Sequence, residues 1–172
     1  MERKGIVTIK GKPLTLVGKG LNVGDKAPDF TVLDSKLHGV GLKDFTGKIK
    51  VISITPSLDT PVCDIQARRF NQEAGKLPDD VVVMNISMDL PFAISRFCTT
   101  AGIDKVKAFS DHKEASFGIA YGVLAKEPRL LTRSIFILDK DDTIKYIEIV
   151  PEMTNHPDYE KALEMVKKLI HS

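Results

Sequence analysis

The chain is poor in cysteine, and this scarcity is the first constraint on its chemistry. Cys63 and Cys98 are its only two cysteines. They are far apart in the sequence and form no Cys-x-x-Cys pair, which argues against a dithiol oxidoreductase built on such a pair. No metal-ligand spacing relates these cysteines to the four histidines, which are His38, His112, His156 and His171. The sequence therefore predicts no metal site.

An excess of charge, long apolar runs and cofactor motifs are absent too. The net charge is +2, which gives no electrostatic reason to expect nucleic acid or an anionic membrane as a partner. No run is long enough to cross a bilayer, and the start of the chain lacks the apolar core of a signal peptide. Gly47-Lys48 does not complete a P-loop, and the acidic turn from Asp139 to Asp142 lacks the glycine and terminal glutamate of an EF-hand loop. We therefore expect a cytoplasmic protein without a cofactor.

The length of the chain and the uniform composition along it predict one domain over residues 1–172. No linker, composition shift or internal repeat divides the chain, and 172 residues are enough for a sizeable core. In the cytoplasm cysteines are normally reduced, which favours a transient catalytic or sensing disulfide over a permanent structural one.

Alternating strand and helix patterns predict a mixed α/β sheet with helices on both faces and an N-terminal β-hairpin. The predicted strands are 6–10, 13–17, 30–33, 40–42, 49–55, 81–87, 108–110, 134–138 and 143–149. The predicted helices are 61–74, a second one from 91 that Gly102 stops, 114–120 and 158–170.

Cys63 stands where a strand pattern gives way to a helical one. Thr60 is a typical N-cap residue, and Pro61 fits the first helical position, so Cys63 falls in the first turn. The free N–H groups and the positive end of the helix dipole stabilise a negative sulfur there. The cap alone would also explain Thr60, and an inert buried thiol is the alternative for Cys63.

A helix terminus alone is not enough to make a thiol reactive at neutral pH. An ordinary thiol has a pKa of about 8.5, and a helix terminus supplies only about 0.3 to 2 kcal/mol, so we expect a cation beside Cys63. Arg68 and Arg69 point well away from Cys63 on an ideal helix and are expected to serve solvation, an ion pair or an interface. Arg133 opens the strand 134–138. If that strand is antiparallel to 49–55, Arg133 lies at the same sheet edge as Cys63; otherwise it is a surface charge at a strand end.

The setting of Cys98 leaves two interpretations open. Phe92, Ile94, Phe97 and Cys98 fit one apolar face of the second predicted helix, on which the cysteine would be a small hydrophobic residue. A redox role for Cys98 is the alternative, and the residues alone do not decide between them.

Motifs over nearly the whole chain resemble those of the peroxiredoxins, in particular of their thiol peroxidase branch. The longest of them is the run from Pro56 to Asp64, which contains Pro56-x-x-x-Thr60-x-x-Cys63. The others are Gly24-Asp25-Lys26-Ala27-Pro28-Asp29-Phe30, Arg68-Arg69-Phe70-Asn71, Arg96-Phe97-Cys98, Arg133 and Pro157-Asp158-Tyr159-Glu160.

The resemblance implies a thioredoxin-like fold and a peroxidase that reduces hydrogen peroxide and organic hydroperoxides. It implies that Cys63 is the nucleophile and becomes a sulfenic acid, with Thr60 and Arg133 holding sulfur and peroxide and Pro56 shielding them from water. Cys98 would condense with the sulfenic acid to give an intramolecular disulfide that thioredoxin reduces. A homodimer is also implied. A non-enzymatic thiol redox sensor or binding module on the same fold is the alternative.

Overall fold

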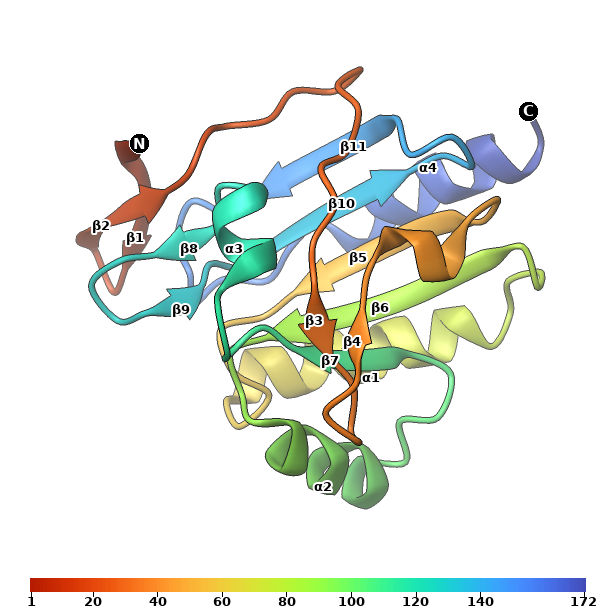
Figure 1. The fold of residues 1–172 in the computed structure, drawn as a ribbon, viewed down its shortest axis with the longest axis horizontal. Coiled ribbons are helices and arrows are strands. Elements are labelled where there is room, and N and C mark those ends of the chain that lie inside the picture. The colour runs from red at the N-terminus through yellow and green to blue at the C-terminus, as the bar shows by residue number, and fades with distance from the viewer.

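A seven-stranded mixed sheet forms the centre of the computed structural model, which describes residues 1–172 (Figure 1). The sheet order is β11 (Ile144–Ile149), β10 (Ser134–Leu138), β5 (Ile49–Ile54), β6 (Val81–Ser87), β7 (Lys107–Ser110), β3 (Val32–Leu33) and β4 (Gly39–Val40). Strands β5, β6 and β7 are parallel to one another, and β10 pairs antiparallel with β5.

Helices cover both faces of this sheet, as predicted. Successive side chains of β5 point to opposite faces. On one face, Val51 belongs to the hydrophobic cluster that α1 (Pro61–Ala74) and α4 (Tyr159–Ile170) cover. On the other face, Ile52 belongs to the cluster that contains Phe117 of α3 (Ser116–Ala120). The remaining helices are α2 (Pro91–Ala101), which packs against β7, and the 3-10 turn η1 (Leu42–Phe45). No helix has the length and apolar composition needed to span a membrane.

The N-terminal hairpin is confirmed and belongs to a second, four-stranded sheet. Strands β1 (Glu2–Ile9) and β2 (Lys12–Val17) meet at a turn in which Lys10 and Gly11 both have positive φ. This backbone is typical of two-residue hairpin turns. β2 also pairs with β8 (Leu124–Ala125), which pairs with β9 (Leu130–Leu131). Neither of these strands was predicted, because two residues show no alternation.

Several boundaries and one buried face differ from the sequence prediction: the first strand already begins at Glu2, the strand expected at 30–33 covers only Val32–Leu33, and the third helix begins at Ser116. The expected strand at 40–42 is shorter, since Leu42 already begins η1. Phe92 was expected on the apolar face of the second helix, but its side chain is 66% exposed. Ile94 is buried, and Phe97 and Cys98 are half-buried, so α2 buries only a narrow face. The predicted stop of this helix at Gly102 is confirmed by a left-handed C-cap with φ 69°.

Candidate active site

Cys63 is the third residue of α1 and is completely buried. The buried strand β5 ends at Ile54, a short loop follows, and Thr60 takes the extended conformation of an N-cap before Pro61. The position predicted for Cys63 is therefore confirmed. The sulfur forms no hydrogen bond in the reduced protein, and Cys98 is also a free thiol.

Arg133 lies at the sheet edge from which the Cys63 loop departs. β10 is antiparallel to β5, and Ser134 pairs with Ile54, so the residue before Ser134 lies at the end of β5. The Arg133 side chain is only 2% exposed. Its Nε donates to the carbonyl of Met153 at 2.9 Å, and Nη1 donates to Oε1 of Gln66 at 2.9 Å. The predicted placement of Arg133 at this edge is confirmed.

Gln66 is a site residue that sequence reasoning missed. It follows Cys63 by three positions and therefore lies on the same side of α1, one turn further on. Its side chain is fully buried, accepts from Arg133, and donates through Nε2 to Oγ of Ser53 at 2.7 Å. A glutamine on the buried side of a helix next to a reactive cysteine was the signal that could have revealed it.

The Arg133 guanidinium is a buried cation without an anionic partner. Met153 and Gln66 offer it uncharged acceptors, and no carboxylate forms an ion pair with it. A buried charge is costly unless an opposite charge or hydrogen bonds compensate it. The site is therefore electrostatically suited to an anion near Arg133.

The pKa of Tyr159 of α4 depends on both Cys63 and Arg133. Burial raises the pKa of the Tyr159 phenol, Arg133 and Arg69 lower it, and Cys63 raises it further. Its hydroxyl is 2.9 Å from Nδ1 of His156, and the Arg69 guanidinium lies over its ring at 5.3 Å.

The adjacent arginines of α1 engage in ion pairs, as expected. Arg68 pairs with Asp64 on its own helix, and Arg69 pairs with Glu160 of α4 at 2.5 Å. Neither forms a hydrogen bond with Cys63.

Thr60 is the N-cap by position, but its hydroxyl does not cap the helix. Oγ1 donates to the carbonyl of Ser57 at 2.9 Å instead. The expected side-chain cap is therefore wrong, because the hydroxyl closes the loop before the helix rather than the first turn.

Pro56, Thr60 and Arg133 line one mostly apolar cavity of about 410 Å³. The N-terminal hairpin contributes a wall that the sequence did not predict. Cys63 does not line this cavity and is fully buried. The other lining residues are Ile9, Lys10, Ser57, Pro61, Val62, Leu130, Met153 and Thr154.

Glu152 fastens the hairpin wall of this cavity to the loop that follows β11. Its carboxylate accepts from the Thr154 hydroxyl at 2.7 Å, from the Thr8 hydroxyl at 2.8 Å and from the Gly11 N–H at 2.9 Å. These hydrogen bonds, those from Thr154 and Gly11 foremost, lower the pKa of Glu152 far below its usual value.

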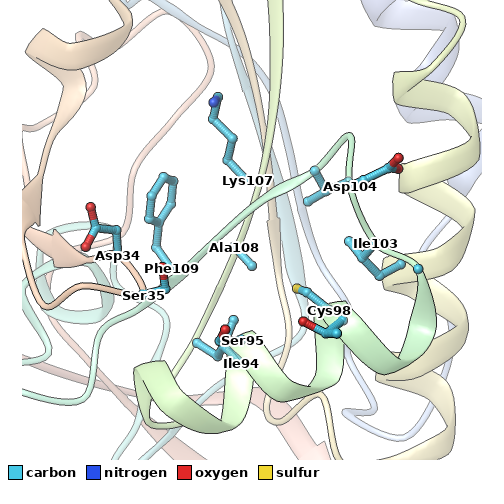
Figure 2. A pocket seen from close by; sticks show the side chains of 13 residues that line it. Asp34, Ser35, Ile94, Ser95, Cys98, Ile103, Asp104, Lys107, Ala108 and Phe109 are labelled. Atoms are coloured by element: carbon cyan, nitrogen blue, oxygen red, sulfur yellow. The ribbon is translucent and has the colours of Figure 1, made fainter.

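Cys98 has a different environment. It lies on α2, packs against the small cluster of Leu58, Ala67 and Ile94, and lines a cavity of about 590 Å³. Figure 2 shows its sulfur on the side of α2 that faces Ala108 of β7. Burial raises the pKa of the Cys98 thiol, and no other group offsets this effect. Cys98 is thus less ready than an ordinary thiol to ionise.

Comparison with known proteins agrees with this geometry. The Redoxin family model matches residues 22–163. The chain belongs to the Redoxin family. It is 56% identical to a thiol peroxidase of Bacillus subtilis over 95% of this chain and 98% of the relative, and 53% identical to one of Halalkalibacterium halodurans over 94% and 96%. The prediction of a peroxidase of the peroxiredoxin class is confirmed.

Solved structures confirm the predicted thioredoxin-like fold. A peroxiredoxin-like protein from Aquifex aeolicus superimposes with a TM-score of 0.89 at 38% identity, over 97% of this chain and 99% of the other. A thiol peroxidase from Chromobacterium violaceum shares the fold, with a TM-score of 0.83 at 20% identity over 94% and 95%.

Proposed function

We propose that Cys63 is the nucleophile of a peroxidase that reduces hydrogen peroxide and organic hydroperoxides. The thiolate attacks one peroxide oxygen, so that an S–O bond forms and the O–O bond breaks. The sulfur is oxidised to a sulfenic acid, and the departing oxygen takes up a proton to leave as water or an alcohol. The observation that carries this proposal is the buried, unpaired Arg133 cation at the sheet edge where α1 begins.

In this proposal Arg133 stabilises the thiolate and the negative charge that develops on the departing oxygen. Its two neutral acceptors fix the plane of the guanidinium and leave its charge uncompensated until an anion arrives. The Thr60 hydroxyl orients the peroxide after leaving the Ser57 carbonyl or while sharing it. Pro56 is buried and limits the access of water.

The apolar wall of the cavity supports organic hydroperoxides as substrates beside hydrogen peroxide. Ile9, Leu130 and Met153 offer an alkyl group contacts that hydrogen peroxide cannot make.

We propose that Cys98 resolves the sulfenic acid. Its thiol displaces the oxygen on Cys63, an S–S bond forms, and water is released. Thioredoxin then reduces the disulfide by dithiol exchange. A disulfide needs α-carbons within about 7 Å, and the two cysteines lie on different helices, so we propose that one or both helices unwind locally. Hydrogen exchange around Cys98 that is as slow in the disulfide form as in the core strands would exclude this unwinding.

We propose that the protein acts as a single domain over residues 1–172 in the cytoplasm, as its length and composition led us to expect. We also propose that it forms a homodimer, as the resemblance implies.

A turnover assay tests the proposal against a non-enzymatic redox sensor. Micromolar protein with a thioredoxin system is mixed with an excess of hydrogen peroxide or an alkyl hydroperoxide, and peroxide loss is followed. An enzyme consumes many equivalents, whereas a sensor reacts once and stops.

A further inference from the structure

One carboxylate joins the two segments that carry the cysteines. Asp89 directly precedes the α2 N-cap, and its Oδ1 accepts from the Ser57 hydroxyl at 2.7 Å. Its Oδ2 accepts from the Leu58 N–H at 2.8 Å and from the Ser87 hydroxyl at 2.9 Å. Ser57 and Leu58 belong to the loop between β5 and α1, whereas Asp89 leads into the helix of Cys98.

An apolar contact accompanies this polar one. Leu58 is 4% exposed and packs against Ala67 of α1 and Ile94 of α2, with Cys98 at the edge of the same cluster. Leu58 thus donates a hydrogen bond from its backbone N–H and makes a hydrophobic contact through its side chain, both to the same neighbouring segment. The loop before Cys63 cannot move away without losing both.

The rest of the boundary between loop and helix is poorly filled. A cavity of about 490 Å³ lies between them and is lined by Ser57, Leu58, Asp89 and Phe97, among others. Beside the packing of Leu58 against Ile94, the hydrogen bonds of Asp89 attach the loop at this boundary. Hydrogen bonds to an ionised acceptor are stronger than neutral ones.

We propose that Asp89 is a positioning residue that latches the loop before Cys63 to the start of α2, and that release of this latch limits formation of the Cys63–Cys98 disulfide. This inference rests on the function proposed above for the two cysteines. While the latch is closed, Cys63 stays buried on α1 and Cys98 stays on an intact α2. The latch thereby sets how long the sulfenic acid survives, and so how often a second peroxide oxidises it to a sulfinic acid.

Replacing Asp89 by asparagine tests the latch. Asparagine keeps the size of the side chain but has one acceptor oxygen and no charge, so it cannot hold Ser57 and Leu58 as the carboxylate does. In a stopped-flow experiment with one equivalent of hydrogen peroxide, we expect the disulfide of Asp89→Asn to form about tenfold faster than in the wild type, a change of about 1.4 kcal/mol. With excess peroxide, mass spectrometry should find several-fold less sulfinic acid on Cys63.

Further variants separate the latch from a general loss of stability. Ser57→Ala removes one of the hydrogen bonds and should show a smaller acceleration in the same direction, which keeps the test open if Asp89→Asn fails to fold. Asp139→Asn is the matched control, because the Asp139 carboxylate also holds a loop through hydrogen bonds, from two backbone N–H groups in the turn between β10 and β11. It should leave both the disulfide rate and the sulfinic acid yield unchanged.

The outcomes distinguish the latch from the function on which it rests. If the wild type forms no Cys63–Cys98 disulfide with peroxide, the proposed function fails. If the wild type forms the disulfide but Asp89→Asn and Ser57→Ala form it at the same rate or more slowly, the function stands and the latch is wrong. The latch is likewise wrong if Asp139→Asn accelerates the disulfide as much as Asp89→Asn does.

Discussion

Arg133 and Gln66 are joined by a hydrogen bond of 2.9 Å between Nη1 and Oε1, and both side chains are buried. This contact ties the end of one strand to the second turn of the helix that carries Cys63. It fixes the guanidinium with an uncharged partner, so the positive charge remains available to a thiolate. A sequence change that alters the charge of Gln66 and little else should therefore affect the chemistry.

Gln66→Glu should slow the reaction of Cys63 with peroxide by about tenfold or more, because a carboxylate beside Arg133 competes with the thiolate for the cation. The measurement is the second-order rate constant of sulfenic acid formation in a Cys98→Ser background. Gln72→Glu, which adds the same charge at an exposed position of α1, is the control and should react at the normal rate. Equal rates in both variants would contradict the role given to Arg133.

Thr60→Ser should retain most of the peroxidase activity, whereas Thr60→Val should lose about tenfold or more, since a lost hydrogen bond to a charged group is worth about 1.5 to 3 kcal/mol. Serine keeps the hydroxyl that donates to Ser57, and valine keeps only the shape. Initial rates of peroxide loss at matched protein concentration measure the difference. A fully active Thr60→Val would leave Thr60 only a structural role at the N-cap position.

Alkylation should reveal the raised pKa of Cys98. Burial stabilises the neutral thiol, so in Cys63→Ser the rate of reaction with iodoacetamide should rise with pH around a midpoint above the usual value of about 8.5. The same variant unfolded in urea is the control and should show the ordinary midpoint. A midpoint below the ordinary one in the folded protein would mean that a cation not seen near Cys98 activates it.

Acid should weaken the attachment of the hairpin through Glu152. Its folded pKa lies below its unfolded pKa of about 4.3, so the stability it contributes is present above that pH and is lost as the pH falls. Between pH 5 and pH 3, Glu152→Gln should therefore lose less stability in urea unfolding than the wild type loses. A parallel decline in both proteins would contradict the assignment.

Asp111 contributes to the same pH profile with the opposite sign. Burial raises its pKa to about 6, so its contribution to stability grows as the pH falls from about 6 towards its unfolded value. Because Asp111 is unchanged in Glu152→Gln, the difference between the two proteins isolates Glu152.

The sequence was sufficient for the parts of the site that local rules determine. Thr60-Pro61 marks the start of a helix, which places Cys63 in its first turn, and Arg133 was expected beside Cys63 on the condition that its strand pairs antiparallel with β5, which it does. These predictions depend on capping, proline geometry and strand direction, which act over a few residues or follow from the sheet.

The contacts that were missed depend on tertiary packing. Gln66 and Asp89 look like ordinary polar residues in the sequence, and only the fold brings them to Arg133 and to Ser57. Phe92 was expected on the apolar face of α2, yet this helix packs against β7 with a narrow face only, and Phe92 stays exposed. The hydrophobic pattern of a helix alone does not predict how much of its apolar surface the sheet buries.

The most direct test of the account is peroxide turnover with a thioredoxin system in three proteins, combined with mass spectrometry of the cysteines. The wild type should turn over many times and pass through a Cys63–Cys98 disulfide. Cys98→Ser should react once and stop as a sulfenic acid on Cys63, and Cys63→Ser should not reduce peroxide. Multiple turnovers by Cys63→Ser would contradict the central claim that Cys63 is the nucleophile.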